Sequence, residues 1–511
     1  MQAKLCVLLL AASPAIAGPK FEPVAIPEHQ YVGGWDHFVG GGLAVFDCSG
    51  DGLPELFAAG GEAPAGLFRN TSSSEVVSFE LDTPAAIALT GLSGAYPVDV
   101  DSDGVTDLVL IGTGKNRLMK GGPDCAFSDF VDLGFISDDR WTTAFSATWE
   151  NAQTLPTLAF GNYVDRNDPN GPFEACDDNT LYRPKGAIYA ESETLSPGFC
   201  ALSILFSDWS RSGKADLRVS NDRHYYVRGG SEQLWRLDDT PRLLTEEDGW
   251  HEYELWGMGI ASRDVTGDGL PDVMLSSMGD QRLQVMERAG SPSWVDAPYG
   301  WGTTAQRPYT GEDGRPSTGW HTAFGDVQND GLDDIFISKG NVEQMPGNAM
   351  LDPNSLLIAE GQRNWTEAGD TAGIASTHRG RGAALVDLNK DGLLDLAVVN
   401  RRAPVEVWQN VTAGTGAYLT VDLQQSGTNR DAVGAWIELD TGTRVIAREI
   451  TVGGGHAGGS LVPEHFGLGK SQGVKLRVIW PDGVASDWAY AATNQNIKVV
   501  RNGKLLRIRP E

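Results

Sequence analysis

Six copies of one nine-residue pattern place oxygen-bearing side chains at alternate positions. The copies begin at Asp47 (DCSGDGLPE), Asp99 (DVDSDGVTD), Asp208 (DWSRSGKAD), Asp264 (DVTGDGLPD), Asp326 (DVQNDGLDD) and Asp387 (DLNKDGLLD). Side chains at alternate positions of a tight loop point to one centre, and hard divalent cations such as Ca2+ take about six to eight oxygen ligands. The repeated pattern therefore predicts five or six structural Ca2+ sites, of which the Asp208 copy is the weakest.

In each copy, side-chain ligands are expected at the first, third, fifth and ninth positions, and a main-chain carbonyl ligand at the seventh. A glycine directly after the fifth position permits the turn that lets these groups converge. The expected side-chain ligands are Asp47, Ser49, Asp51, Glu55, Asp99, Asp101, Asp103, Asp107, Asp208, Ser210, Ser212, Asp216, Asp264, Thr266, Asp268, Asp272, Asp326, Gln328, Asp330, Asp334, Asp387, Asn389, Asp391 and Asp395. The expected carbonyl ligands belong to Leu53, Val105, Lys214, Leu270, Leu332 and Leu393.

The alternative interpretation of these loops is an Asp/Gly-rich turn without metal. The Asp99 copy argues against it, because four carboxylates in one loop would repel one another without a cation. The Asp208 copy fits it better, since Ser210 and Ser212 stand where most copies have carboxylates or amides.

Short apolar segments flank each copy, for example residues 42–46 (GLAVF) and 56–60 (LFAAG). An EF-hand would instead carry a closing Glu at its twelfth position and would be flanked by helices. The flanks therefore predict that each loop joins two β-strands.

The spacing of the loops predicts the architecture that carries them. Their starts are 52, 109, 56, 62 and 61 residues apart, so the long interval has room for one more unit. Residues 145–162 (FSATWENAQTLPTLAFGN) keep the strand, turn, strand pattern but offer Trp149, Asn151, Gln153 and Thr157 at the ligand positions. A repeat of this length with several short strands is typical of a β-propeller with four-stranded blades. We therefore expect an all-β, seven-bladed, calcium-binding propeller in which one blade has lost its metal.

The N-terminal segment is expected to close the ring. Blades end on an aromatic strand, such as those at Trp294 and Trp365, but only three strands follow Asp387 before the composition changes near Thr412. The segment from Phe21 (FEPVAIP) supplies the missing fourth strand, which would remove exposed sheet edges. The alternative is an unstructured leader.

These features resemble known families. The loops are similar to FG-GAP (VCBS-type) repeats, the calcium-bearing blades of integrin alpha chains and of cartilage-acidic-protein-like proteins. The C-terminal stretch resembles the ASPIC/UnbV domain, through NRDAVGAWIELDTG from Asn429, REITVGGGHAGGS from Arg448, EHFGLGKS from Glu464 and VIWPDG from Val478. The resemblance implies a bacterial, exported, cartilage-acidic-protein-like chain with a propeller at 18–411 and a small β-domain at 412–511. It implies no activity.

The N-terminus and the cysteines indicate export. Residues 1–17 read as a signal peptide, with an apolar run after Lys4 and a small-residue cleavage site ending at Ala17. Four cysteines remain, an even number suited to an oxidising compartment. We expect Cys176–Cys200, because a long polar connection separates them, and then Cys48–Cys125 by elimination; free buried thiols are the alternative. No later segment approaches the roughly 20 apolar residues that span a membrane.

The formal net charge of −28 accompanies 41% hydrophobic residues, so the acidity does not indicate disorder. Much of it lies at ligand positions, and bound Ca2+ would neutralise it. Metal binding is therefore expected to be linked to folding. The residual acidity disfavours nucleic acid and anionic membranes as partners.

The connections on the face opposite the loops carry Trp, His and Arg residues that should converge near the propeller axis. The candidates are Trp35, His37, Arg140, Trp141, Asp222, Arg223, His224, His251, Asp280, Arg282, Trp320, His321, Arg379, Arg381, Arg401 and Arg402. Aromatic faces beside basic groups suit sugars, carboxylates or a peptide. The alternative is that Trp and His fill the axis while Arg pairs with surplus Asp.

We therefore expect a binding or adhesion module for an extracellular or periplasmic glycan or protein. An exported enzyme acting on a polysaccharide at the same face is the second hypothesis, with His321, His251 or Asp222 in catalysis. Catalysis would need paired carboxylates or a His with an orienting acid. The run Gly453–His456 superficially looks like a phosphate loop, but it lies between strand-like segments, which favours a turn or bulge.

Overall fold

The computed structural model describes residues 18–510 except 152, 170, 172–173 and 223–229. The expected signal peptide therefore lies outside the described residues. Within them, regular structure is almost entirely β, and no helix is long and apolar enough to cross a membrane. The helical elements are short: η1 (Trp35–His37), η2 (Pro123–Cys125), η3 (Glu246–Asp248), η4 (Tyr299–Trp301) and α1 (Gly369–Ala372).

The described residues before the C-terminal domain form seven antiparallel units of four strands. Units one to three are β2 (Leu43–Phe46), β3 (Glu55–Ala58), β4 (Gly66–Asn70), β5 (Phe79–Leu81); β6 (Leu92–Val98), β7 (Asp107–Lys115), β8 (Arg117–Gly121), β9 (Phe127–Asp129); and β10 (Asp139–Thr148), β11 (Thr157–Asn162), β12 (Asn179–Tyr182), β13 (Glu193–Leu195). Units four to six are β14 (Ala201–Ser207), β15 (Asp216–Asn221), β16 (Gln233–Arg236), β17 (Arg242–Leu243); β18 (Gly257–Arg263), β19 (Asp272–Ser277), β20 (Arg282–Met286), β21 (Trp294–Asp296); and β22 (Gly319–Gly325), β23 (Asp334–Lys339), β24 (Ser355–Gly361), β25 (Asn364–Glu367).

The seventh unit combines the two ends of this region. It contains β26 (Arg379–Val386), β27 (Asp395–Arg401), β28 (Glu406–Asn410) and β1 (Phe21–Val24). Strand β1 pairs antiparallel with β28, with Phe21 opposite Asn410. The N-terminal segment is therefore the closing strand, as predicted.

The seven units form a closed, propeller-like ring. Their first strands contact one another in the order β2, β6, β10, β14, β18, β22 and β26, and β26 contacts β2 again. Second strands such as β15, β19 and β23 are buried along their whole length, because other units cover both of their faces. Each predicted metal loop joins the first strand of a unit to its second.

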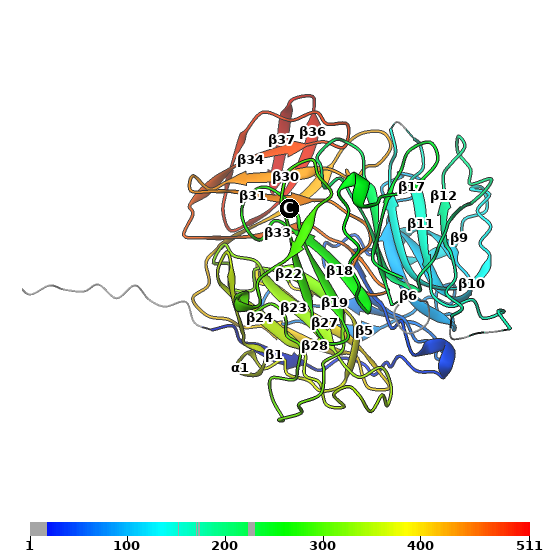
Figure 1. The fold of residues 1–511 in the computed structure, drawn as a ribbon. Coiled ribbons are helices and arrows are strands. Elements are labelled where there is room, and N and C mark those ends of the chain that lie inside the picture. The colour runs from blue at the N-terminus through cyan, green and yellow to red at the C-terminus, as the bar shows by residue number, and fades with distance from the viewer. Residues whose placement is uncertain (1–17, 152, 170, 172–173, 223–229, 511) are drawn as a thin grey trace, which may run out of the picture.

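The C-terminal domain packs two four-stranded sheets against each other and lies over the ring (Figure 1). One sheet has the order β33 (Glu464–Gly469), β29 (Ala417–Gln424), β36 (Gln495–Asn502), β37 (Leu505–Pro510). The other has the order β31 (Val445–Glu449), β30 (Trp436–Asp440), β34 (Gly473–Ile479), β35 (Ala489–Ala492). Buried aliphatic residues from both sheets, including Leu419, Ile437 and Leu476, form its core.

A segment of the C-terminal domain enters the centre of the ring. Residues 452–461, between β31 and β33, form single bridges to first strands: Val452 to Ala147, Gly453 to Leu205, Gly455 to Ile260 and Gly458 to Ala95. The segment ends in β32 (Ser460–Leu461), which pairs parallel with β2. We call residues 452–461 the axial segment. The local turn or bulge expected at Gly453–His456 does not explain these bridges, because the partner residues belong to strands hundreds of residues away in the sequence.

Glycines make room for the axial segment. A Cβ on Gly94 would lie 1.6 Å from the Ala457 carbonyl oxygen, and one on Gly42 would lie 1.7 Å from the same atom. These distances are far below van der Waals contact, so neither Gly94 in β6 nor Gly42, the residue before β2, can carry a side chain. The centre of the ring is thus filled largely by main chain, and this contact joins the two domains.

Replacing Gly94 by Ala should therefore be strongly destabilising. Overpacking of this kind costs about 1–3 kcal/mol, and the opposing atom here is main chain, so we expect the upper end of that range or a failure to fold. Gly347→Ala is the matched control, since no atom lies within 4 Å of the position that a Cβ would take there. Urea unfolding of both variants tests the prediction, and equal stabilities would contradict it.

Candidate metal centres and the opposite face

The six loops share one hydrogen-bond pattern. The carboxylate at the first position accepts the main-chain N–H of the glycine at the sixth, with N–O distances from 2.6 to 2.9 Å. That glycine has φ between +79° and +94° in every copy, a backbone conformation that L side chains rarely adopt. The sixth-position glycine thus turns the chain so that the loop wraps around its first carboxylate.

The ninth-position carboxylate anchors the other end of each loop. In the Asp99 copy, Asp107 Oδ2 accepts the N–H of Val100 at 2.9 Å and its Oδ1 accepts that of Gly121 at 2.7 Å. Burial is the main cause that raises the pKa of Asp107 to about 8 and that of Asp272 to about 7. Carboxylates buried this far from water favour either a proton or a cation.

The donor atoms fit a hard cation. Oxygens of Asp99, Asp101 and Asp107 lie within 4.8 Å of one another. At the third position of two other copies, Thr266 Oγ1 and Asn389 Oδ1 are buried without a hydrogen-bond partner. Unsatisfied buried oxygens are uncommon in proteins, and here they occupy predicted ligand positions. An all-oxygen set of this kind suits Ca2+ better than softer metals.

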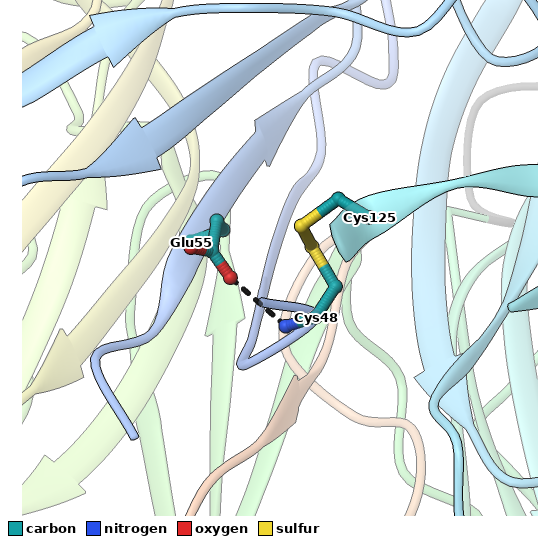
Figure 2. Close-up of side chains that lie close together, drawn as sticks. All are labelled: Cys48, Glu55 and Cys125. Atoms are coloured by element: carbon teal, nitrogen blue, oxygen red, sulfur yellow. Dashed lines mark hydrogen bonds between the residues drawn. A yellow bond between two sulfur atoms is a disulfide. The ribbon is translucent and has the colours of Figure 1, made fainter. Parts of the chain in front are cut away.

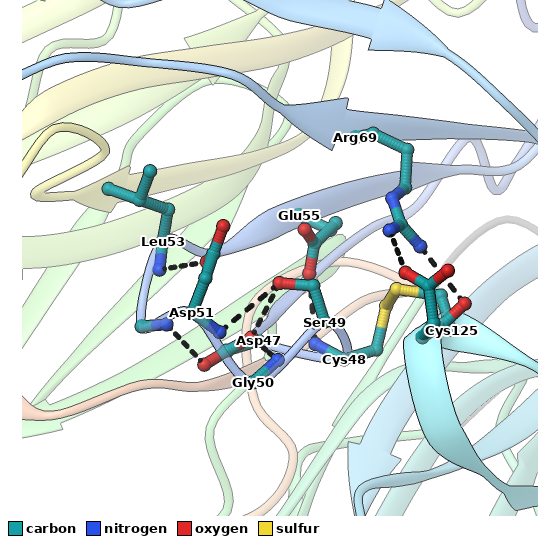
Figure 3. Close-up of a disulfide and its surroundings, with 11 residues drawn as sticks. Asp47, Cys48, Ser49, Gly50, Asp51, Leu53, Glu55, Arg69 and Cys125 are labelled. Atoms are coloured by element: carbon teal, nitrogen blue, oxygen red, sulfur yellow. Dashed lines mark hydrogen bonds and ion pairs between the residues drawn. A yellow bond between two sulfur atoms is a disulfide. The ribbon is translucent and has the colours of Figure 1, made fainter.

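A second cluster of potential metal-binding groups is a disulfide. Cys48, Glu55 and Cys125 lie together, but the two sulfurs are bonded to each other (Figure 2). Cys48 is the second residue of the first loop, and its N–H donates to Glu55 Oε2 at 2.9 Å. Figure 3 shows the same loop with the Asp47 carboxylate held by main-chain N–H groups. The disulfide therefore fastens the first loop to η2 of the second unit.

The second disulfide joins Cys176 to Cys200. Both predicted pairings are confirmed, and the alternative of free thiols is wrong. Disulfides persist in oxidising compartments, so their presence agrees with export.

The Asp208 loop differs from the others because the C-terminal domain supplies an acidic partner. Glu449 accepts the N–H of Asp208 at 2.6 Å and the hydroxyl of Ser207 at 2.6 Å. Burial is the main cause that raises the pKa of Glu449 to about 8. The Arg211 guanidinium pairs with Glu438 at 2.7 Å. Side chains of both domains thus surround this loop.

The loop that begins at Trp149 carries an ion pair at its second position, Glu150. Arg183 donates from Nε and Nη2 to the two carboxylate oxygens of Glu150, at 2.8 and 3.0 Å. Thr157, at the ninth position, donates to Glu150 Oε1 at 2.6 Å. A guanidinium thus supplies positive charge beside this loop.

The C-terminal domain covers much of the loop face. Arg430 Nη1 donates to the Asp103 carbonyl at 2.9 Å. The N–H of Gly469 donates to the Asn329 carbonyl at 2.8 Å, and His465 Nε2 lies 3.1 Å from the Gly392 carbonyl oxygen. These partners belong to the Asp99, Asp326 and Asp387 loops. The predicted metal sites therefore lie at or beside a domain interface.

On the opposite face, many of the candidate residues are buried. Trp141, Trp320 and Arg381 have no exposed surface, and the Arg381 guanidinium lies 3.8 Å from the centroid of the Trp320 ring. His37, His321, Asp222 and Arg401 are also buried. Asp222 accepts a hydrogen bond from the Tyr163 hydroxyl at 2.7 Å. These side chains fill the axis and do not present a surface to a ligand, which corresponds to the alternative interpretation.

Several arginines of this face are paired with acids. Arg401, Arg402 and Arg379 surround Glu343, with N–O distances of 2.6, 2.6 and 3.6 Å. Partial burial alone would raise the pKa of Glu343, but the hydrogen bond and charge of Arg401, with the other two arginines, lower it. Arg140 pairs with Asp177, and Arg282 pairs with Asp280 and Asp296.

Trp35 remains prominently exposed. Its side chain is 49% exposed, and its ring lies 4.7 Å from the Phe38 ring and 6.2 Å from the Trp141 ring, centroid to centroid. His251 is exposed near Tyr253. Arg223 and His224 lie outside the described residues. The structure thus separates a packed aromatic layer from one indole that reaches solvent.

The axial segment is the structural element that sequence reasoning missed. Its His456 accepts the N–H of Gly40 at Nε2 (3.3 Å) and lies beside the Met258 carbonyl at Nδ1 (3.1 Å). The His456 N–H donates to His321 Nδ1 at 3.1 Å. Three consecutive glycines, more than a hairpin turn requires, were the available indication in the sequence.

Comparison with known proteins supports the predicted resemblance of the C-terminal domain. Residues 425–505 match the family model described as ASPIC and UnbV. The chain is 22% identical to mouse Cartilage acidic protein 1 over 489 residues, which cover 89% of this chain and 72% of that protein. The predicted resemblance to ASPIC/UnbV proteins is therefore confirmed.

Solved structures give partial likenesses. The BP39L lectin from Burkholderia pseudomallei has a TM-score of 0.41 and 12% identity, covering 74% of this chain and 97% of the lectin. The Bacillus licheniformis rhamnogalacturonan lyase PL11 has a TM-score of 0.35 and 11% identity, covering 76% of this chain and 75% of the lyase.

The axial histidines predict a specific pH dependence. Burial lowers the pKa of His456 to about 3 and that of His321 to about 4 from an ordinary value of 6.5. Below pH 6.5 these imidazoles bind protons in the unfolded chain but not in the folded chain. The free energy of unfolding therefore falls as the pH drops towards 4. Above pH 6.5 the imidazoles are neutral in both states and this loss is absent.

His456→Gln should reduce this acid sensitivity. Between neutral pH and pH near 4.5, we expect the wild-type protein to lose about 2–3 kcal/mol more unfolding free energy than the variant. Carboxylates titrate in both proteins and cancel in the comparison. Urea unfolding at the two pH values measures the difference, and parallel losses would contradict the prediction.

Proposed function

We propose that this protein is an exported, calcium-stabilised binding module, with its ligand surface on the ring face opposite the metal loops. The ligand is a glycan or a protein outside the cytoplasm, in the periplasm or beyond the cell. Nucleic acid is not the partner, because the chain carries a net charge of −28.

The calcium part of the proposal is supported by the donor set and its setting. Loops with a shared carboxylate geometry carry buried third-position oxygens without partners, such as Thr266 Oγ1. Like-charged carboxylates gather in the same loops, and desolvation raises the pKa of several of them. A cation would satisfy the oxygens and remove the repulsion. Because the C-terminal domain contacts several loops, bound Ca2+ would also stabilise the domain interface.

The ligand surface rests on one observation, the exposed indole of Trp35 above a buried aromatic layer. Trp35 belongs to η1, and the adjacent Gly34 N–H donates to Glu62 Oε1 at 2.8 Å. An aromatic face next to polar groups suits the apolar face of a sugar ring, or a side chain of a protein ligand. Arg402, with a side chain 48% exposed, lies on the same ring face and can donate hydrogen bonds at the rim.

Binding is favoured over catalysis by the state of the ionisable side chains near this surface. Glu343 is held by three arginines, and desolvation is the main cause that lowers the pKa of His37. A general acid or base needs a proton that it can exchange with a bound substrate. The paired carboxylate and the buried imidazole are poorly placed for that exchange.

Removal of calcium should destabilise the whole molecule. Several sites bind the native loops and not the unfolded chain, so a chelator should lower the melting midpoint by roughly 10 °C or more. Differential scanning calorimetry with and without chelator measures the shift. An unchanged curve would count against structural calcium.

The loops should differ in their contribution. Asp103→Asn removes a charged fifth-position ligand, whereas Ser212→Ala removes a neutral one from the weaker Asp208 loop. We expect the first to lower calcium affinity at its site by at least about tenfold and the second to have little effect. Calcium titration calorimetry of both variants decides the order, and equal effects would show that the ranking is wrong.

Trp35→Ala should weaken ligand attachment without changing the fold. A glycan array and an extracellular protein panel, each with product detection, identify the ligand first. Loss of an aromatic contact then predicts at least about a tenfold weaker Kd. Trp488→Ala is the control, since Trp488 is 39% exposed but belongs to the C-terminal domain. Unchanged affinity in Trp35→Ala, or turnover of a substrate, would reject this surface as a simple binding site.

A further inference from the structure

A cavity of about 220 Å³ lies between the ring and the C-terminal domain. Its apolar lining includes Phe324, Leu385 and Leu394 from units six and seven, together with Leu461 and Val462 from the end of the axial segment and the residue after it. A cavity of about 150 Å³ with an apolar lining holds benzene. This one is therefore large enough for a six-membered ring with one small substituent.

Cationic side chains line the same cavity. Arg448 is buried, and its Nη2 lies 2.8 Å from Asp333 Oδ1. Arg263 Nη1 lies 3.4 Å from Glu464 Oε2. Within the described part of the chain, Lys390 forms no ion pair. Positive charge thus borders an otherwise largely apolar space.

Some polar atoms of these residues lack partners. Arg448 Nε, Arg263 Nε and His465 Nδ1 are buried without a hydrogen bond. A buried donor left unsatisfied costs about 1–3 kcal/mol, so an occupant or small rearrangement that satisfies these groups would be favoured. Two of the three atoms are guanidinium donors, which select an anionic acceptor.

The charge of the lining depends on the metal loops. Asp47 and Asp387 also line the cavity, and both are first-position ligands in the proposed calcium sites. Once they ligate Ca2+, Glu464 and Asp333 remain as the acids that face the three cations Arg263, Arg448 and Lys390. The calcium-loaded cavity is then net cationic, so this step rests on the proposed function.

We infer that the calcium-loaded protein binds a compact organic monocarboxylate in this cavity. The apolar body of the ligand packs against Phe324, Leu385 and Val462, and its carboxylate is held by Arg263, Arg448 and Lys390. A ligand in this position contacts both domains and stabilises their docking.

The test is titration calorimetry of the full-length, calcium-saturated protein with benzoate. Benzyl alcohol serves as the uncharged probe of similar size, and sulfate as an anion without an apolar body. Saturable binding of benzoate, with at least about tenfold weaker binding of the other two, is expected. No benzoate binding, equal binding of benzyl alcohol, or equal binding of sulfate would overturn the inference.

Two variants test whether benzoate binds in the cavity. Lys390→Gln removes a cation and should weaken benzoate about tenfold, while Val462→Phe fills the apolar space and should abolish binding. Lys475→Gln is the control, because Lys475 is 66% exposed in the C-terminal domain. Unchanged benzoate affinity in both cavity variants would contradict the assignment.

Calcium titration of the same samples separates the two proposals. If calcium binds and benzoate does not, the inference fails and the calcium proposal stands. If no calcium binds, the calcium proposal fails, and benzoate binding by that protein would show that the cavity does not need calcium to hold an anion. The number of calcium ions bound by Lys390→Gln also shows whether the substitution disturbs the Asp387 loop, to which Lys390 belongs, and not only the cavity.

Discussion

The contact of the axial segment with Gly42, just before β2, and Gly94, in β6, determines how the two domains of this molecule fit together. The Ala457 carbonyl lies where Gly42 and Gly94 would carry a Cβ, so the ring leaves room only for main chain at these two positions. The ring and the C-terminal domain are consequently one packing unit, although their strands form separate sheets. The axial segment also determines which face the C-terminal domain covers, because that domain lies at both ends of the segment.

The covering C-terminal domain changes the surroundings of the six acidic loops. In isolation, six acidic loops on one face would be an exposed, strongly negative surface. Here Arg430, Glu449 and His465 reach three of them from the other domain. Cations in the loops would therefore lower repulsion within each loop and between loops and neighbouring domain acids. Asp47 and Asp387 of these loops also line the cavity between the domains, so cations at the proposed metal sites would change the charge of the cavity.

The features that could be predicted from the sequence are mainly those that depend on residues close together in the chain. Loop residues such as Asp264 and Gly269 are close together in the chain, so their spacing alone indicates their geometry. Strand β1 could also be placed, because the last unit visibly lacked a strand. The axial segment could not be predicted, since Gly453–Gly455 carry no side-chain pattern and their partners Leu205 and Ile260 are distant in sequence. The burial of individual side chains could not be predicted either. Trp35 and Trp141 occupy similar sequence contexts, yet Trp35 is 49% exposed and Trp141 is 0% exposed.

The filled axis also limits the kind of ligand that the ring can recognise. Trp141, Trp320 and Arg381 pack on one side of the axial segment, and the C-terminal domain covers the other, so among the described residues the centre offers no open passage. On the proposed ligand face, recognition would therefore rely on surface features such as the Trp35 indole. Shallow aromatic surfaces suit extended ligands that lie across them, whereas small molecules need enclosure. For the proposed binding functions, an extended glycan or a protein surface is therefore better matched to that face, and a small carboxylate to the cavity between the domains.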